Sequence, residues 1–448
     1  MRTKADVVER CSADDLELVR LVYVGNDGVP RGYVVDANAI ESKFDDGMNL
    51  TKGMQSFNAL DHLSPTGPFG PVGSVRLLPD PETFQVLPYA DRSAILLCTM
   101  ETTDGEPWEA DPRSALLEFL EEIDLVPASA FESEFYLIER TEDGLEPLED
   151  SVCFSPDGIQ LMTDFVLELK DALEAQGMEF ETYYPEYGPG QQEFVVKHDE
   201  GIRAADNHVL FKQTVKAVAM NRNHRATFVP KPFEDAAGSG CHIHLSLWNG
   251  DENVFYDPDA DDQAYPLSEA ARHFIGGVLE HAPALTALTA PTTLSYKRLR
   301  PHMWASAYTC WGEDNREAIV RVPFAGVDNP EKTTRIEFKP ADNTANPYLA
   351  LLGLLAAGYD GLERELDPGT PLESDPETLS ETERRERSIT RLPETLGEAL
   401  DALAADDVIA DALGTSLFES YLDVKRTEWN EYTGTATEWE LEALTRAF

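Results

Sequence analysis

Three short segments of this chain, residues 131–135, 241–247 and 335–339, alternate apolar and polar residues with a period of two. This pattern is typical of strands that are buried on one face only. The side chains on the polar faces are Glu132 and Glu134, then His242, His244 and Ser246, and then Arg335, Glu337 and Lys339. Three such strands indicate a sheet whose charged face lines a cavity and not open solvent.

Each segment alone also has a simpler explanation. In an acidic chain, a Glu-x-Glu strand can be a solvated strand edge, and a His-x-His strand can be hydrogen-bonded structure. An Arg-x-Glu-x-Lys strand can be a cross-strand charge ladder. The three strands occur together with an acidic, glycine-rich segment at residues 181–193. That coincidence favours a functional site.

The rest of the pattern predicts two domains of unequal size. Residues 1–104 form a small β-rich region, in which strands are expected at 19–24, 32–35, 74–78 and 94–98. Residues 105–448 alternate strands and helices, and Pro112 opens the first of these helices. Later helices are expected at 159–176, 203–222, 267–288 and from Asn346 onward.

The charge of the chain narrows its possible partners. It has 83 acidic and 36 basic residues among 448, and its formal net charge is −47. The acidic excess is spread along the chain and 42% of the residues are hydrophobic, so a folded protein is expected. Nucleic acid and anionic membranes are poor partners for such a field. We interpret the charge as halophilic, suited to a cytoplasm in which salt screens repulsion to a few ångströms.

Cysteine usage and apolar runs predict a soluble, cytoplasmic protein. The five cysteines include no C-x-x-C pair, so neither a disulfide framework nor a zinc ribbon is expected. The N-terminus has no apolar signal core. The most apolar run, residues 349–358, is too short to span a bilayer.

The candidate chemistry is metal-dependent phosphoryl transfer. Converging polar faces would offer one imidazole and five carboxylates, namely His242, Glu132, Glu134, Glu186, Glu193 and Glu337. Such a donor set favours two or more Mg²⁺ or Mn²⁺ ions over Zn²⁺ or copper. The basic residues expected beside it are Arg298, Arg316, Arg321, Arg335 and Lys339. Metal ions and arginines stabilise phosphoryl-transfer transition states, and ATP must be held without a G-x-x-x-x-G-K-[ST] loop.

These motifs, in this order, resemble those of the class I glutamine synthetase family over nearly the whole chain. The matching segments are FESEF, EYGPGQQE, GSGCHIHLSL, SYKRL, DNREAIVRVP and RIEFKPADNTANPYL. The resemblance implies an α+β fold, with a small N-terminal β-grasp domain and a larger catalytic domain in which helices flank an antiparallel sheet. It also implies a homo-oligomer of two stacked hexameric rings, a dodecamer, with active sites shared between neighbours.

The same resemblance implies roles for individual residues. Those that match metal ligands are Glu134, Glu186 and Glu193 for one ion and Glu132, His242 and Glu337 for a second. Those that match ATP contacts are Glu181, His244, Ser246, Arg321, Lys332 and Arg335. Those that match the glutamate site are Gly238, Arg298, Arg316 and Lys339, and the catalytic arginines at the transferred phosphate are Arg316 and Arg321. The implied reaction activates L-glutamate as γ-glutamyl phosphate, which an amine attacks to form an amide.

The sequence departs from the family pattern at positions that bind the amine substrate. After SYKRL, ammonia-using members carry P-G-Y-E-A-P, whose glutamate helps to bind and deprotonate ammonium, whereas Trp304 occupies that place here. The D-G-S-S segment, which supplies a second carboxylate from the neighbouring subunit, is not recognisable, and residues 52–56 stand roughly there. Losing two anions weakens the attraction for a small cation, and an indole face suits an organic amine. Three other positions also differ from the family pattern. A usual Asn is replaced by Ala237, an Arg by Lys339, and the tyrosine that is adenylylated in some relatives by Glu377.

We therefore expect an ATP-dependent glutamate–amine ligase, closest in motif to the γ-glutamylpolyamine synthetase-like branch. Its second substrate would be an organic amine or polyamine such as putrescine, and Trp304 would belong to the catalytic site. One alternative is an authentic glutamine synthetase that uses ammonium. Another is a non-catalytic ring that acts as a scaffold or nitrogen sensor.

Overall fold

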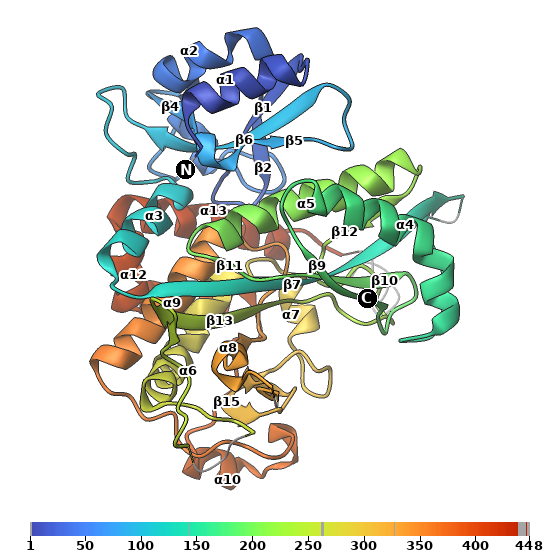
Figure 1. Cartoon of the computed structure of the whole chain (residues 1–448). Helices are drawn as coiled ribbons and strands as arrows, with labels where there is room; N and C mark the ends of the chain where they lie inside the picture. The colour runs from blue at the N-terminus through green and yellow to red at the C-terminus, as the bar shows by residue number, and fades with distance from the viewer. Residues whose placement is uncertain (1, 143, 261–263, 327, 438–444, 446–448) are drawn as a thin grey trace.

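The computed structural model describes residues 2–142, 144–260, 264–326, 328–437 and 445. A small N-terminal sheet domain stands above a larger domain of sheet and helices (Figure 1). The predicted α+β class is therefore confirmed, while the boundary between residues 104 and 105 stays a prediction. None of the helices in the described part is long and apolar enough to cross a membrane.

The N-terminal sheet has the strand order β2-β1-β6-β4-β3, with β5 paired to β6. Strand β1 forms an antiparallel hairpin with β2 and runs parallel to β6. The strands are β1 (Leu18–Val24), β2 (Pro30–Asp36), β3 (Met48–Thr51), β4 (Ser74–Pro79), β5 (Gln85–Val86) and β6 (Ser93–Glu101). Two helices that the strand pattern did not predict, α1 (Lys4–Ala13) and α2 (Ile40–Asp46), bury Val7 and Phe44 in the core of this domain.

The larger sheet follows the order β15-β16-β17-β13-β7-β10-β9, and β8, β11, β12 and β14 pair outside this path. Its described strands pair antiparallel except for β15 with β16. They are β7 (Val126–Thr141), β8 (Gly144–Pro147), β9 (Phe180–Pro185), β10 (Gln191–Val196), β11 (Asp199–Glu200), β12 (Arg225–Thr227), β13 (Cys241–Asn249), β14 (Glu252–Asn253), β15 (Tyr308–Glu313), β16 (Ala318–Val322) and β17 (Ile336–Phe338).

Aromatic contacts fix which face of this sheet is buried. Phe165 of α4 (Pro156–Glu174) lies 6.5 Å from Phe135 of β7, and Phe211 of α5 (Arg203–Asn221) lies 6.2 Å from Phe194 of β10, measured between ring centroids. Side chains alternate between the two faces of a strand. The polar positions of β7 and β10 are therefore turned away from these two helices.

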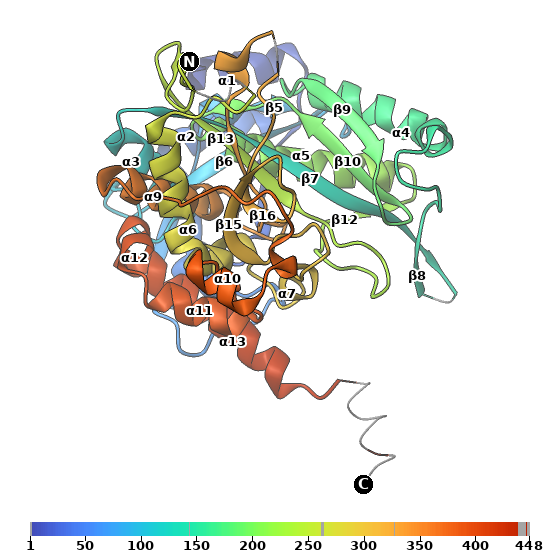
Figure 2. The same cartoon turned by 90° about the horizontal axis from the view of Figure 1, so that it is seen from below.

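The remaining helices form the body around the other end of the sheet. They are α3 (Pro112–Glu122), α6 (Glu269–Thr289), α7 (Ser295–Arg298), α8 (Pro330–Thr333), α9 (Pro347–Glu363), α10 (Glu381–Glu386), α11 (Leu396–Ala404), α12 (Asp407–Leu413) and α13 (Thr415–Gly434). Helix α9, which contains the most apolar run of the sequence, is buried against α3, α5, α6 and α12. Helix α11 packs against α13, and α13 leads toward the C-terminus (Figure 2).

Candidate active site

The candidate site is assembled by strand register. The charged residues meet as cross-strand pairs, which are Glu193–Glu134, Glu132–His242, His244–Glu337 and Glu337–Arg321. Directly opposite residues share one face of a sheet with their Cβ atoms about 4.5–5.5 Å apart. The register of β10, β7, β13, β17 and β16 thus places carboxylates, imidazoles and a guanidinium in one continuous row.

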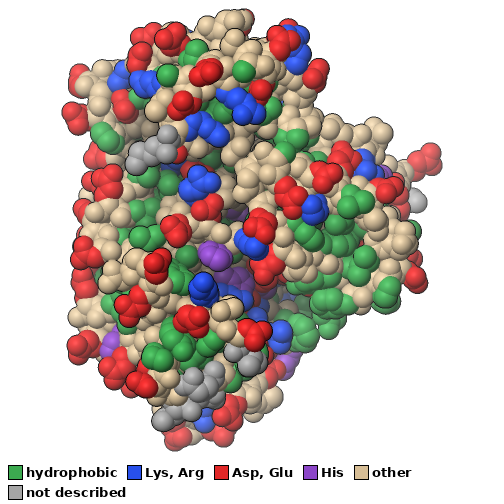
Figure 3. All heavy atoms as spheres, in the orientation of Figure 1, with side chains coloured by type: hydrophobic (Ala, Val, Ile, Leu, Met, Phe, Trp, Pro, Cys, Tyr) green, Lys and Arg blue, Asp and Glu red, His purple; other side chains and the backbone are tan. Residues whose placement is uncertain are grey.

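This row lines a cavity of about 880 Å³. Acidic side chains are spread over the face drawn in Figure 3, and His and basic side chains gather at its central hollow. The predicted site residues that line the cavity are Glu132, Glu134, Glu186, Glu193, Gly238, His242, His244, Arg298, Trp304, Arg316, Arg321, Arg335, Glu337 and Lys339. The three polar strand faces therefore converge as the sequence predicted.

Three predicted ATP contacts lie outside this lining. Glu181, at the start of β9, and Lys332, on α8, are exposed. Ser246 is buried on β13, where its hydroxyl accepts a 2.9 Å hydrogen bond from the indole N–H of Trp248. Their roles at the nucleotide stay predictions.

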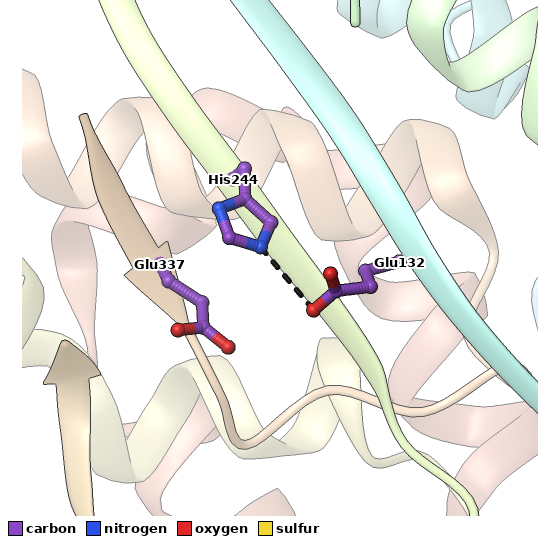
Figure 4. Close-up of side chains that lie close together, drawn as sticks. All are labelled: Glu132, His244 and Glu337. Atoms are coloured by element: carbon purple, nitrogen blue, oxygen red, sulfur yellow. Dashed lines mark hydrogen bonds and ion pairs between the residues drawn. The ribbon is translucent and has the colours of Figure 1, made fainter. Parts of the chain in front are cut away.

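Two histidines contact the same pair of carboxylates. Among the described residues, one group of side chains has ligand atoms all within 4.8 Å of one another, and it consists of Glu132, His244 and Glu337 (Figure 4). His242 also reaches this pair, with Nδ1 3.2 Å from Glu337 and 3.5 Å from Glu132. The geometry therefore offers either imidazole to an ion between Glu132 and Glu337. The prediction of His242 as the ligand and of His244 as a nucleotide contact is not tested by these distances.

The carboxylates lie so close together that bound cations would stabilise them. Glu134 and Glu193 lie directly opposite each other, an arrangement that is destabilising for like charges. Burial, together with the charges of Glu132 and Glu134, raises the pKa of Glu193 well above its usual range. Burial and Glu134 raise the pKa of Glu186 to about 7. Carboxylates with an imidazole are the donors that Mg²⁺ and Mn²⁺ accept, so the residues present fit these ions.

Three residues that position these carboxylates were not predicted as site residues. The amide of Gln191 donates a 2.9 Å hydrogen bond to Glu134, and the backbone N–H of Gly240 donates one of 3.0 Å. The hydroxyl of Tyr184, on β9, donates to Glu193, its cross-strand partner on β10. Gln191 lies inside the EYGPGQQE segment between two predicted ligands, and that position was the available signal.

Fixed cations border the carboxylates. Arg321 donates a 2.7 Å hydrogen bond to Glu337 and bonds of 2.8 and 2.6 Å to Asp314. The ammonium of Lys339 lies 3.3 Å from Glu337. Burial alone would raise the pKa of Glu337, but Lys339 and the hydrogen bond with His242 hold that pKa well below its usual range. Glu337 is therefore an ionised carboxylate at the centre of the row.

Arg298 is buried beside the glycine segment 238–240. Its guanidinium donates to the carbonyls of Ala341 at 3.0 Å and Lys339 at 3.3 Å. A Cβ atom at Gly238 would lie 2.7 Å from Arg298 Cγ, and one at Gly240 would lie 2.5 Å from Nη2. Side chains at these positions would displace Arg298, which explains why the segment needs glycine.

Comparison with known proteins fits this arrangement. A family model described as glutamine synthetase, catalytic domain, matches residues 109–444, and one described as glutamine synthetase N-terminal domain matches residues 3–108. The chain belongs to the glutamine synthetase family. It is therefore a ligase of the ATP-dependent type that this family contains.

Individual relatives cover almost the whole molecule. The glutamine synthetase of Thermus thermophilus is 36% identical, over 98% of each chain. That of Halobacterium salinarum is 36% identical, over 99% of this chain and 96% of its own. The structure of GmaS in complex with ADP has 31% sequence identity, a TM-score of 0.85, and coverage of 98% of this chain and 99% of its own. This glutamine synthetase family member thus shares both domains with its relatives.

Trp304 stands at the surface of the cavity of this family member. Its side chain is 54% exposed, and its backbone N–H donates a 2.9 Å hydrogen bond to Glu317. Its φ of 52° lies in the left-handed region, which is uncommon for a bulky residue. The loop 301–306 therefore holds the indole in a defined place.

Proposed function

We propose that this member of the family joins L-glutamate to an organic amine, with γ-glutamyl phosphate formed at the expense of ATP. The observation that supports the proposal is the aromatic wall of the cavity. Trp304 and Tyr187 lie edge to face and line the cavity together with Glu186. In the sequence, Trp304 occupies the place of the glutamate that ammonia-using members carry. An aromatic face attracts a substituted ammonium through its alkyl surface and by cation–π attraction of about 0.5–2 kcal/mol.

The proposed roles of the chain's residues follow from their contacts. The buried guanidinium of Arg298 would hold the glutamate substrate next to Gly238. Arg321, fixed by Asp314 and Glu337, would place positive charge at the transferred phosphoryl group. Divalent ions held by the carboxylates and an imidazole would, when bound, neutralise phosphate charge.

Arg316 supplies a second cation to the same cavity. Its side chain is exposed, and no ion pair of its guanidinium occurs among the described residues. A guanidinium without an internal partner is available to bind phosphate oxygens in a bidentate manner. We assign Arg316 to the phosphate and to glutamate on this basis.

A second candidate function is glutamine synthesis from ammonium. The curated relatives at 34–36% identity carry the name glutamine synthetase. The cavity also contains Glu186 next to Tyr187, a carboxylate that could take part in binding ammonium. The alternative of a non-catalytic scaffold or nitrogen sensor is set aside because the chain belongs to a family of ligases and its six predicted metal donors line one cavity.

Assembly and environment are part of the proposal. We infer that the chain forms a cytoplasmic dodecamer of two hexameric rings and that its net charge of −47 suits high salt. Polyamines such as putrescine are proposed as substrates because a diamine combines an apolar stem with two cationic ends.

The test is ATP-dependent phosphate release measured with L-glutamate and a panel of amines. The panel contains ammonium, methylamine, ethanolamine, putrescine and spermidine. We expect release to require both glutamate and an amine, with an organic amine giving a higher kcat/KM than ammonium. Release supported by ammonium alone within the panel would instead identify a glutamine synthetase.

A further inference from the structure

A second cleft, of about 600 Å³, lies around α10 at the end of the molecule farthest from the N-terminal domain (Figure 1). Its lining contains three of the chain's scarce basic residues, Arg384, Arg385 and Arg391. Tyr308 and Glu377 lie among them. The lining also contains three glutamates, Glu377, Glu381 and Glu394, so basic and acidic residues are equal in number there, whereas acidic residues outnumber basic ones by 83 to 36 over the whole chain.

Two of these arginines are held in place by the fold. The backbone of Arg391 pairs antiparallel with that of Tyr308, and the N–H of Thr309 donates a 2.8 Å hydrogen bond to the carbonyl of Thr390. Arg384 donates a 3.1 Å hydrogen bond to the carbonyl of Pro376. The guanidinium groups of Arg384 and Arg391 lie 5.0 and 5.2 Å from the centroid of the Tyr308 ring. Because these cations are already ordered, a ligand would bind them at a small entropic cost.

The acidic residues of the cleft leave Arg385 without a partner. Glu377 accepts a hydrogen bond from Tyr308 and lies 3.5 Å from Arg384, and Glu394 lies 3.3 Å from Arg391. Within the described part of the chain, Arg385 forms no ion pair, and its side chain is exposed on the last turn of α10. Glu381 also lines the cleft and is exposed, so it opposes an anion there.

We propose that this cleft binds a small phosphate-bearing molecule through Arg384, Arg385 and Arg391. Guanidinium groups bind phosphate oxygens with paired, charge-assisted hydrogen bonds, and three of them line this cleft. The volume exceeds that of a bare phosphate and admits an attached organic group. The bound phosphate competes with Glu377 for Arg384.

The cleft shares a wall with the active-site cavity. Pro301 lines the cleft, whereas His302 and Trp304 of the same loop line the cavity. His302 Nδ1 lies 2.9 Å from Asp375, which caps the turn Pro376–Thr378 that Arg384 holds. Occupation of the cleft therefore loosens the anchor of the Trp304 loop and alters the KM for the amine. This consequence, unlike the site itself, rests on the proposed function.

The experiment is isothermal titration of glycerol 3-phosphate into the full-length protein. A non-hydrolysable ATP analogue, glutamate and Mg²⁺ occupy the active site, and salt is kept at the lowest concentration that preserves the assembly. We expect one site per subunit. Arg385→Ala should weaken binding about tenfold or more, and Glu381→Gln should strengthen it. Arg387→Ala is the matched control, because Arg387 follows the same helix but does not line the cleft.

No saturable binding, or equal weakening by Arg385→Ala and Arg387→Ala, would overturn the proposed site. The second readout is the KM for the amine with and without glycerol 3-phosphate. An unchanged KM in the presence of measured binding would overturn the coupling to the Trp304 loop alone. A preference of the enzyme for ammonium would overturn the proposed function and leave the binding result standing.

Discussion

Trp304 and Tyr187 meet edge to face, with ring centroids 5.5 Å apart and ring planes at 79°. They come from segments more than a hundred residues apart, the EYGPGQQE hairpin and the loop after α7, and both line the active-site cavity. Edge-to-face contact is a favoured geometry for aromatic pairs. The pair gives the cavity an apolar, electron-rich wall at the place where we propose that the amine binds.

Replacement of Trp304 should change the choice of amine. We expect Trp304→Ala to lower kcat/KM for the preferred organic amine by about 2- to 30-fold, the range that corresponds to a lost cation–π contact. Trp304→Glu should raise the use of ammonium relative to a diamine, because it adds a carboxylate. Trp304→Phe keeps an aromatic face and is the matched control. Unchanged amine preference in all three variants would show that this position does not select the substrate.

Removal of Glu337 should abolish turnover. This carboxylate is buried between Arg321, Lys339 and the two histidines, so Glu337→Ala removes a candidate metal ligand and leaves buried cations unpaired. We expect a fall in kcat of at least about a hundredfold, as when an interaction essential to the transition state is lost. Mn²⁺ binding followed by electron paramagnetic resonance should weaken in parallel. Glu139→Ala, at an exposed position of β7, is the control. Normal activity of Glu337→Ala would refute the assignment.

His281 should make stability depend on pH. It is buried in α6, with Nδ1 2.7 Å from Asp406 and Nε2 3.0 Å from Asp360. Burial alone would lower its pKa, but the two hydrogen-bonded carboxylates raise the pKa of His281 above its ordinary value. Its contribution to the free energy of unfolding is fully present below about pH 6.5, the unfolded pKa. That contribution is lost as the pH rises through the folded pKa.

The measurement is denaturant unfolding at fixed salt between about pH 6 and pH 9, a range that spans the ordinary titration of histidine. His281→Gln should flatten the decrease of stability with rising pH. His198→Gln, which alters an exposed histidine, is the matched control. An identical pH profile for wild type and His281→Gln would show that this histidine makes no such contribution.

Low salt should destabilise the protein. The net charge of −47 makes the acidic side chains of the folded protein repel one another. The Debye length, over which this repulsion acts, is about 3 Å at 1 M salt and about 10 Å at 0.1 M. We expect unfolding or subunit dissociation on dialysis from molar KCl to dilute buffer, followed by circular dichroism and light scattering. Full stability in dilute buffer would contradict a halophilic character.

The sequence predicted the α+β class and the strands that carry charged faces, but not how those strands pair. Period-two alternation identified β7, β13 and β17 because each strand buries one face, and alternation also assigns each side chain to a face. It could not give the register, which places Glu132 opposite His242 and His244 opposite Glu337. Register depends on contacts between distant segments, and local pattern contains no information about them.

The helices α1 and α2 were also not predicted, because their burial depends on contacts with distant segments. Their apolar faces are short, and Val7 and Phe44 are buried only because the N-terminal sheet covers them. The hydrogen bond from Gln191 to Glu134 was also not predicted, since the only signal was the position of this glutamine between two predicted ligands. The apolar run 349–358 lies in α9, and the burial of that helix in the larger domain explains its composition.

The most direct test of the central claim is a competition reaction analysed by mass spectrometry. The enzyme receives ATP, L-glutamate, Mg²⁺ and equal concentrations of ammonium and of the best organic amine from the panel. The account predicts that the γ-glutamyl amide of the organic amine is the main product. Glutamine as the main product would contradict it.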